Sequence, residues 1–458
     1  MGQNVNEREI VLNLLIEFDK NERHANELLS GALAKVDYLP ANEKAFVKRL
    51  FEGVIEKQYY LEHVIKRYIK TPISKVKKVL RLILRMGVYQ LLFMDSVPDN
   101  AACDEAVKLC KKVNMKPQSG FVNGVLRNIA RAGDKLKAEK FTDLVEYNSG
   151  KGYTQALSIF YSVPLWLVQK FEKVYGREKT LGILEGYQEQ RPVTVRFCVA
   201  GDKLGGWLDS IRSKGIQIKQ HPFVPYAYEV KGTSGISQLP GYAEGMFYVQ
   251  DVSSMLVCEL ADIEPGMRVI DVCSAPGGKG LHAAFLGAKV SARDVSEGKV
   301  SIIRKNADRL GYTSDDQINI FVQDARTVRE EDVESADVVI ADVPCSGYGI
   351  VGKKCDIKYG VSEEKEDSLV VLQREIIDAV CQYVKRGALL MYSTCTINSR
   401  ENEQQLEYIK SKGFELESIE DRLPDALKGQ TGNKGYIQLF PGINRCDGFF
   451  IARLRRNR

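Results

Sequence analysis

"VIDVCSAPGGKG", residues 269–280, is an apolar run that ends in an aspartate and opens directly into a glycine-rich turn. The β-branched residues Val269 and Ile270 favour a buried strand, whereas Gly277 and Gly278 let the backbone approach a ligand closely before a helix begins. The turn matches neither the GxGxxG pattern of dinucleotide-binding loops nor the GxxxxGK(S/T) pattern of phosphate-binding loops. The stretch therefore predicts a strand–loop–helix unit whose ligand is not a dinucleotide.

The same alternation continues beyond residue 280. Further short apolar segments end in a polar residue, and most of them are followed by a helical pattern, which predicts a doubly wound, mainly parallel α/β sheet. In such sheets ligands bind at the carboxyl ends of the strands. The segments are MRVIDV, KVSARD, INIFVQD, ADVVIAD and GALLMYS, and the candidate residues at or just after their ends are Asp271, Asp294, Asp324, Asp342 and Cys395.

The order of the carboxylates indicates the kind of ligand. Asp294 lies 23 residues after Asp271, about where a second-strand carboxylate binds ribose hydroxyls, and Asp324 is placed to receive an adenine amino group. A single aspartate at a strand end is often only a helix N-cap, but three in this order favour a specific site. We expect a nucleoside-bearing cofactor without a pyrophosphate.

Two cysteines follow neighbouring strands of the predicted sheet. Cys345 lies in "ADVPCSGYG", just after Asp342, and Cys395 lies in "YSTCTINS". A lone cysteine is usually an inert core residue. Two of them at adjacent strand ends, beside a carboxylate, favour catalysis by a thiol.

Residues 5–140 carry apolar residues at steps of three and four, which predicts a helical region. Residues 51–140 hold 18 Lys and Arg against 9 Asp and Glu, whereas the whole chain has a net charge of only +5. Lys77, Arg81 and Arg85 are spaced to form a basic ridge on one helix. The region is expected to bind a polyanion, although a merely solvated helical surface would give the same charge pattern.

Length and composition set broader limits. A chain of 458 residues with 44% hydrophobic and 27% charged residues is expected to fold into several globular domains. The N-terminus has no signal-peptide pattern and arginines interrupt the long apolar runs, so we expect a cytoplasmic protein without a membrane partner. Ten cysteines without a CxxC pair and four scattered histidines favour reduced thiols and predict no metal site.

Several motifs together resemble a known family. "VIDVCSAPGGKG", "DVPCSG", "DIKY" and "YSTCTINSRENE", with "MFYVQDVSSML" and "DGFFIARLRR", are similar to the S-adenosylmethionine-dependent RNA cytosine-C5 methyltransferases over about residues 245–455. "LRLILRMGVYQLLFMDSVPDNAACDEAVKLCKK" and "GFVNGVLRNIAR" resemble the NusB-like RNA-binding domain. That domain is fused to one branch of the family, the bacterial Sun/Fmu enzymes that methylate a cytosine of 16S ribosomal RNA.

The resemblance implies an architecture and partners. It implies an all-α NusB-like RNA-binding domain in residues 1–142, a small α+β connecting domain in 143–245, and a Rossmann-like class I methyltransferase domain in 246–458. It also implies S-adenosyl-L-methionine as cofactor, and a monomer that acts on 16S rRNA, naked or in early small-subunit particles. By the same resemblance the expected product is 5-methylcytosine at cytosine 967 of that RNA.

The resemblance also implies roles for individual residues. Cys395 would attack C6 of the base, Cys345 would assist product release, Asp342 would hold the base and Lys279 would favour thiolate formation nearby. DNA cytosine-C5 methyltransferases use a Pro-Cys nucleophile, so the residues alone leave the order of the two cysteines open, and the paired PC and TC motifs assign Cys395. The implied cofactor-binding residues are Cys273, Ser274, Ala275, Pro276, Gly277, Gly278, Lys279, Asp294, Lys299, Asp324 and Asp342.

The sequence departs mildly from the family pattern and leaves alternatives open. Gly280 stands where Thr is usual, which removes a side-chain hydroxyl close to the cofactor loop, while Val343 replaces Ala and Tyr359 replaces Trp. A tRNA, other RNA or DNA cytosine-C5 methyltransferase is one alternative, and a non-catalytic RNA-binding factor on a retained methyltransferase scaffold is another. The NusB-like region favours ribosomal RNA as the substrate.

Overall fold

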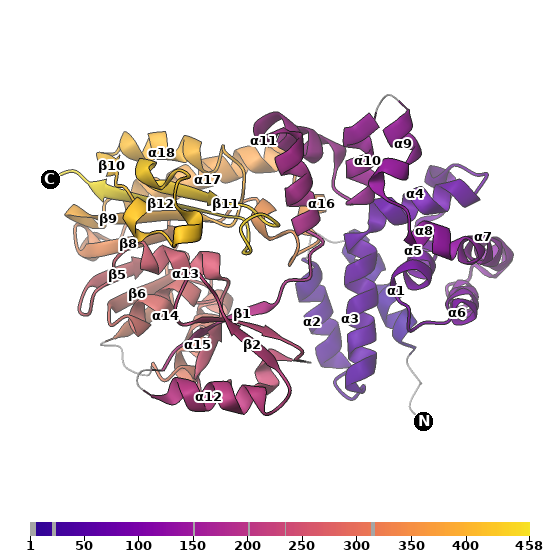
Figure 1. The fold of residues 1–458 in the computed structure, drawn as a ribbon, viewed down its shortest axis with the longest axis horizontal. Helices are drawn as coiled ribbons and strands as arrows, with labels where there is room; N and C mark the ends of the chain where they lie inside the picture. The colour runs from indigo at the N-terminus through magenta and orange to yellow at the C-terminus, as the bar shows by residue number, and fades with distance from the viewer. Residues whose placement is uncertain (1–5, 21–23, 150–151, 200–201, 234, 313–316) are drawn as a thin grey trace. The chain divides into compact units, whose positions relative to one another are not determined.

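The computed structural model describes residues 6–20, 24–149, 152–199, 202–233, 235–312 and 317–458. The chain forms two compact units, one made of Met1–Gln188 with Val351–Gly360 and the other of Glu189–Ile350 with Val361–Arg458 (Figure 1). The predicted domain boundaries after residues 142 and 245 stay a prediction. The first unit is called the helical unit below, and the second is called the sheet unit.

The helical unit is built around α5 (Lys78–Phe93), which is buried along most of its length. Close approach of its neighbours depends on glycine: a Cβ at Gly53 would lie 2.0 Å from the Tyr89 ring, and one at Gly87 would lie 2.6 Å from Leu126. The observed helices confirm the predicted all-α region. The other helices are α1 (Glu7–Lys20), α2 (Ala25–Lys35), α3 (Ala41–Glu56), α4 (Gln58–Tyr68), α6 (Asp99–Lys112), α7 (Ser119–Arg131), α8 (Gly133–Lys137), α9 (Val145–Asn148), α10 (Gly152–Phe160), α11 (Leu165–Gly186) and α16 (Ile357–Gly360).

None of the described helices is both long enough and apolar enough to cross a membrane.

The predicted basic ridge on α5 is wrong. Arg81 and Arg85 lie against α4 and share the carboxylate of Glu62, which is 4.0 Å from Arg81 Nη1 and closer to Arg85 Nη2. Their side chains are only 25% and 14% exposed, so these two positive charges are neutralised inside the unit and do not form an exposed basic surface. Exposed cations do lie around the α4–α5 connection, and four of them have no carboxylate partner among the described residues: Lys66, Lys70, Lys75 and Lys77.

The sheet unit begins with a small antiparallel sheet in the order β2-β3-β1-β4. Trp207 of α12 (Lys203–Arg212) packs against Phe197, Tyr228 and Phe247 of this sheet, and its indole N–H donates to Pro240 O at 2.9 Å. These contacts give the predicted α+β module a core of its own. The strands are β1 (Val193–Phe197), β2 (Gln217–Gln220), β3 (Ala227–Lys231) and β4 (Phe247–Val249).

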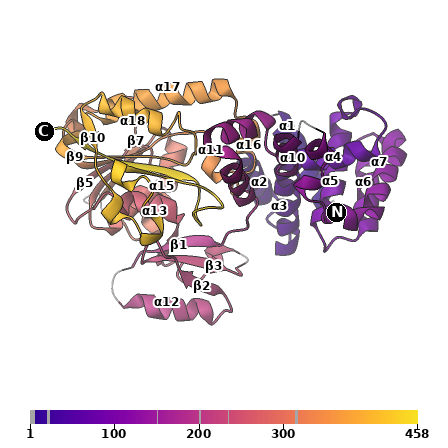
Figure 2. The same cartoon turned by 45° about the horizontal axis from the view of Figure 1, so that its top comes forward.

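The large sheet has the order β10-β12-β9-β8-β5-β6-β7, with β11 paired to β12. Strands β5 to β9 run parallel, as predicted, while β12 runs antiparallel to β9 and pairs on its other side with β10 and β11. Helices α13, α14 and α15 pack on one face and α17 and α18 on the other (Figure 2). The elements are α13 (Val252–Glu259), β5 (Arg268–Asp271), α14 (Gly278–Phe285), β6 (Lys289–Asp294), α15 (Glu297–Arg309), β7 (Ile318–Val322), β8 (Ala336–Asp342), α17 (Glu363–Val380), β9 (Val384–Thr394), α18 (Glu403–Lys410), β10 (Phe414–Leu416), β11 (Tyr436–Leu439) and β12 (Phe449–Arg456).

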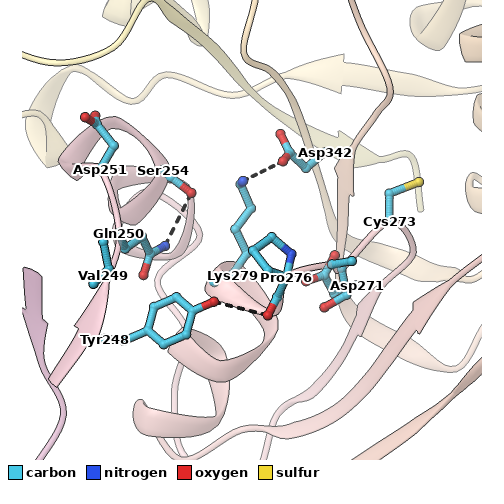
Figure 3. Close-up of a pocket in the computed structure, with 13 residues that line it drawn as sticks. Tyr248, Val249, Gln250, Asp251, Ser254, Asp271, Cys273, Pro276, Lys279 and Asp342 are labelled. Carbon is cyan, nitrogen blue, oxygen red and sulfur yellow. Dashed lines mark hydrogen bonds and ion pairs between the residues drawn. The ribbon is translucent and has the colours of Figure 1, made fainter. Parts of the chain in front are cut away.

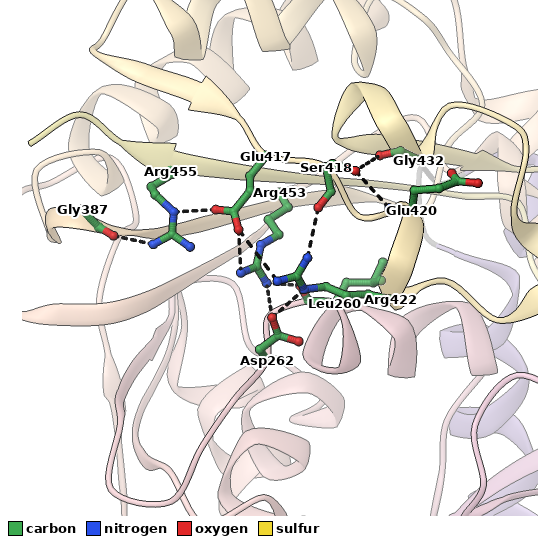
Figure 4. Close-up of polar contacts among 10 residues, drawn as sticks. All are labelled: Leu260, Asp262, Gly387, Glu417, Ser418, Glu420, Arg422, Gly432, Arg453 and Arg455. Carbon is green, nitrogen blue, oxygen red and sulfur yellow. Dashed lines mark hydrogen bonds and ion pairs between the residues drawn. The ribbon is translucent and has the colours of Figure 1, made fainter.

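An ion-pair network anchors strand β12. Arg453 is 2% exposed, donates to the carbonyl of Leu260 and pairs with Asp262 and Glu417 at 3.2 Å each (Figure 4). Arg422 pairs with both of these carboxylates and Arg455 pairs with Glu417, so buried charge is compensated from several sides. The network holds β12 beside β9, whose carboxyl end leads into Cys395.

Candidate active site

The glycine-rich turn forms the predicted strand–loop–helix unit. Asp271 is the last residue of β5, and α14 begins at Gly278. Gly277 has φ +108°, and a Cβ there would lie 2.8 Å from Leu281 Cδ1. Both the backbone conformation and the space require glycine at this position.

Asp294 braces this loop from the end of β6. It is 3% exposed, and its Oδ2 accepts the backbone N–H of Ala275 at 3.0 Å. Its Oδ1 accepts the N–H of Val295 at 2.8 Å and pairs with Lys299 Nζ at 3.0 Å. The structure therefore brings Asp294, Lys299 and the loop together, as expected for one ligand site.

Asp324 does not lie in the same cavity as the loop. It follows β7 by two residues, and Arg326 donates to both its oxygens at 2.7–3.1 Å. These hydrogen bonds lower the pKa of the Asp324 carboxyl. Asp324 lines a separate shallow depression with Arg326, Thr327, Glu375 and Asp378, so its predicted adenine contact stays a prediction.

A cavity of about 190 Å³ lies beside the loop (Figure 3). Its far wall comes from β4 and the start of α13, which the analysis of single residues missed although "MFYVQDVSSML" marks the place. There Tyr248 donates to Pro276 O at 3.1 Å, and Gln250 donates to Ser254 Oγ at 3.3 Å. The lining residues are Tyr248, Val249, Gln250, Asp251, Ser254, Asp271, Cys273, Ser274, Ala275, Pro276, Gly278, Lys279 and Asp342.

Asp271 is a buried carboxyl at the base of this cavity. It is 1% exposed, neither of its oxygens has a hydrogen-bond partner among the described residues, and burial raises its pKa to about 7. A Cβ at Gly280 would lie 3.2 Å from Asp271 Oδ2 and 3.0 Å from Ser274 Oγ. A side chain at position 280 would therefore lie against both polar groups, and the expected effect of its absence on the cofactor contacts stays a prediction.

Lys279 and Asp342 form an ion pair at the cavity wall. Lys279 Nζ lies 2.6 Å from Asp342 Oδ2, and Ser393 Oγ donates to Asp342 Oδ1 at 2.8 Å. Burial alone would lower the pKa of the Lys279 ammonium, but the charge and hydrogen bond of Asp342 outweigh it and raise that pKa. Lys279 therefore remains a cation inside the site.

The two candidate cysteines meet at the ends of β8 and β9. Cys345 Sγ lies 3.3 Å from Cys395 Sγ, and Gly349 N–H donates to Cys395 O at 3.0 Å, which ties the two loops together. The hydrogen bond with Cys395, burial and the negative charges of Glu401 and Asp342 raise the pKa of the Cys345 thiol well above its usual value. Cys345 therefore keeps its proton at neutral pH.

Buried polar residues that the sequence analysis did not single out support the cysteine loops. Thr394 Oγ1 donates to Asn402 Oδ1 at 2.6 Å, and Asn402 Nδ2 donates to Thr396 O at 3.0 Å. Glu401 is also fully buried and contacts the Cys345 loop. The signal that could have found Asn402 and Glu401 is the polar run "SRENE" within the quoted motif.

Comparisons with known proteins agree with this site. Residues 259–455 match the family described as 16S rRNA methyltransferase RsmB/F, and residues 5–131 match the NusB family. The chain is 31% identical to the probable ribosomal RNA small subunit methyltransferase B of Bacillus subtilis, with 98% of each chain covered. It is 30% identical to the protein of the same name from Synechocystis sp., with 99% of this chain and 100% of the other covered.

A solved structure shows the same fold. The crystal structure of PH0851 covers 100% of both chains with a TM-score of 0.76 at 22% identity. The loop, the ion pair and the paired thiols lie within or beside the part of the chain that matches the methyltransferase family model. The chain therefore belongs to the 16S rRNA methyltransferase RsmB/F family, joined to a NusB-family region, and is an S-adenosylmethionine-dependent rRNA methyltransferase.

Proposed function

We propose that this enzyme methylates C5 of a cytosine in 16S rRNA through a covalent bond between Cys395 and C6 of the base. The observation that carries the proposal is the 3.3 Å separation of the Cys345 and Cys395 thiols beside the Lys279–Asp342 ion pair. One thiol is needed to activate the ring, and a second group is needed to remove a proton from it. The family description and the names of the relatives support rRNA of the small subunit as the substrate.

The residues of the cavity fit S-adenosylmethionine. Asp271 offers a buried carboxyl without a partner to a cationic amino group, and Asp294 offers a carboxylate beside the glycine loop to ribose hydroxyls. The loop from Cys273 to Gly278, with Lys299 next to Asp294, completes the proposed binding residues. When bound, this cofactor supplies an electrophilic methyl group.

Cys395 activates the base. C5 of cytosine is a poor carbon nucleophile, so the Cys395 thiolate first adds to C6, which breaks the C5–C6 π bond and makes C5 enamine-like. The target nucleotide must leave its stack to reach the sulfur. Asp342, fixed by Lys279 and Ser393, accepts a hydrogen bond from the exocyclic amine and shares a proton with N3 of the base, and this proton neutralises the charge that develops on the ring when Cys395 adds.

Cys345 completes the cycle. After C5 has gained the methyl group, its proton leaves, the C5–C6 double bond re-forms and Cys395 departs as a thiolate. Bond formation at C6 removes the Cys395 hydrogen bond and charge that hold the Cys345 proton. Cys345 can then ionise and accept the C5 proton, directly or through one water.

The helical unit supplies RNA affinity. Its exposed lysines around the α4–α5 connection, Lys66, Lys70, Lys75 and Lys77, have no carboxylate partner among the described residues and are free to contact phosphates. The proposed target is cytosine 967, on naked RNA or on an early small-subunit particle, and the proposed active form is the monomer.

Bisulfite sequencing of RNA from cells that lack the gene tests this function. One 5-methylcytosine in 16S rRNA is expected to disappear, to return with the wild-type gene, and not to return with Cys395→Ala. If methylation is lost from a tRNA or another RNA while 16S rRNA is unchanged, that RNA is the substrate and the proposed substrate is wrong. If Cys395→Ala restored the 5-methylcytosine, the covalent mechanism through Cys395 would be wrong.

A further inference from the structure

Glu401 is a buried carboxylate that the mechanism above does not use. It is 0% exposed, and its Oε2 accepts the backbone N–H of Ser346 at 2.9 Å and Gln373 Nε2 at 3.0 Å. Its Oε1 accepts Asn398 Nδ2 at 2.8 Å. These donors are neutral, so Glu401 is held by hydrogen bonds and has no ion pair among the described residues.

The partners of Glu401 belong to both cysteine loops. Ser346 directly follows Cys345, and Asn398 lies three residues after Cys395. Ser346 Oγ also lies 2.7 Å from Thr396 Oγ1, the residue next to Cys395. One carboxylate therefore fixes the separation of the two loops, and with it the separation of the two sulfurs.

The charged and titratable groups around the thiols are distributed unevenly. Cys345 faces Cys395 at the end of β9, Asp342 at the end of β8 and Glu401 before α18. The charge of Asp342 is offset by Lys279 of α14 at 2.6 Å, and Lys279 also interacts electrostatically with Cys395.

The remaining groups near Glu401 leave its charge largely in place. Tyr392 of β9 is a neutral phenol whose pKa burial and the charge of Glu401 raise. Arg400 forms its ion pairs with Glu366 and Asp367 and interacts with Glu401 only at longer range. The least compensated negative charge thus lies on the Cys345 side, and the cation lies on the Cys395 side.

We propose that Glu401 is a positioning residue that makes the two thiols inequivalent: it fixes the Cys345 loop and adds a negative charge on the Cys345 side, so that Cys395 is the thiol that attacks. The proposal deepens the proposed function and rests on it. It supplies a physical reason for the order of the two cysteines, which the residues alone, without the family resemblance, leave open.

The charge of Glu401 is tested by alkylation of the full-length protein without RNA or cofactor. Initial rates of iodoacetamide modification at Cys345 and Cys395 are measured by mass spectrometry from pH 6 to 10. In Glu401→Gln the Cys345 profile is expected to move to lower pH, with a rate at pH 8 above that of wild type, because loss of the Glu401 charge lowers the pKa of the Cys345 thiol. Glu366→Gln is the matched control, since Glu366 is 1% exposed and accepts Tyr348 Oη in the same loop at 2.6 Å.

An unchanged Cys345 profile in Glu401→Gln, or an equal shift in Glu366→Gln, would overturn the proposal. Because no RNA is present, this result does not depend on which nucleic acid is methylated. If Glu401→Gln shifts the Cys345 profile but the protein does not methylate 16S rRNA, the proposed function fails while the proposed role of Glu401 stands.

Glu401→Asp tests the positioning role separately and serves if Glu401→Gln does not fold. The shorter side chain keeps the charge but cannot reach both loops, so the Cys345 profile should stay within about twofold of wild type while kcat falls at least about tenfold and KM for S-adenosylmethionine is unchanged. A wild-type kcat, or a Cys345 profile that moves as in Glu401→Gln, would contradict the assignment.

Discussion

Cys345 Sγ lies 3.3 Å from Cys395 Sγ although the two residues are 50 positions apart in the chain. The register of the parallel pair β8–β9 brings this about, since Asp342 pairs with Ser393 and the two chains then leave the sheet side by side. A carboxylate, a hydroxyl and two thiols are thereby placed at one edge of the sheet. This geometry links the fold to the proposed two-thiol chemistry.

Asp294→Ala should weaken S-adenosylmethionine binding by about 1–3 kcal/mol, because the variant loses a charged acceptor in a buried site. It also releases the backbone of Ala275 in the glycine loop. Isothermal titration calorimetry measures the change. Asp308→Ala, an exposed aspartate on α15, is the control and should bind as wild type does. Equal affinities for Asp294→Ala and wild type would remove Asp294 from the site.

Asp271→Asn should change how stability depends on pH. The folded-state pKa of Asp271 is about 7, above its ordinary value of 3.8, so the folded chain binds an extra proton between these values and wild-type stability falls as pH rises through this window. The asparagine side chain does not ionise, so the variant does not lose stability in this way as pH rises. Its free energy of unfolding relative to wild type should therefore rise by about 4 kcal/mol between pH 4 and pH 8.

Urea unfolding of the cofactor-free protein at several pH values tests this difference. The exposed control Asp308→Asn should show a flat difference over the same range. A flat difference for Asp271→Asn as well would mean that the Asp271 carboxyl is ionised in the folded protein well below pH 7.

Replacing Lys66, Lys70, Lys75 and Lys77 together by Ala should raise the dissociation constant for rRNA and flatten its salt dependence. Each lost phosphate contact on single-stranded RNA lowers the slope of log K against log salt by about 0.7, so loss of all four contacts lowers it by roughly 3. Filter binding at several salt concentrations gives the slope. Arg85→Ala should leave the slope unchanged, because Glu62 already neutralises that arginine. If the slope fell in Arg85→Ala and stayed unchanged in the four-lysine variant, the RNA-binding surface would lie on α5 instead.

Much of the site could be predicted because parallel strands bring their carboxyl ends together. Asp271, Asp294 and Asp342 each end a strand, and the two cysteines follow neighbouring strands, so local pattern alone was sufficient. Asp324 could not be judged in this way. Arg326, two residues away, donates a hydrogen bond to the Asp324 carboxylate and so occupies an oxygen that a ligand would need. The strand pattern does not reveal this contact.

Other features depended on packing between distant segments. The periodicity of α5 showed that Arg81 and Arg85 share a face, but not that α4 would set Glu62 against them. The cavity wall at Tyr248 required β4 and α13 to pack beside the glycine loop. The antiparallel strand β12 required a pairing with β9 that no local signal defines.

The most direct test of the central claim is the fate of the protein–RNA bond in the two cysteine variants. If Cys395 attacks C6 and Cys345 assists release, Cys345→Ala incubated with rRNA and S-adenosylmethionine should migrate with RNA on a denaturing gel. A thioether survives denaturant, whereas electrostatic RNA contacts do not. The adduct should be absent in Cys395→Ala and in the double variant. An adduct in Cys395→Ala and none in Cys345→Ala would reverse the roles, and no adduct in either single variant with a competent RNA would contradict the two-thiol account.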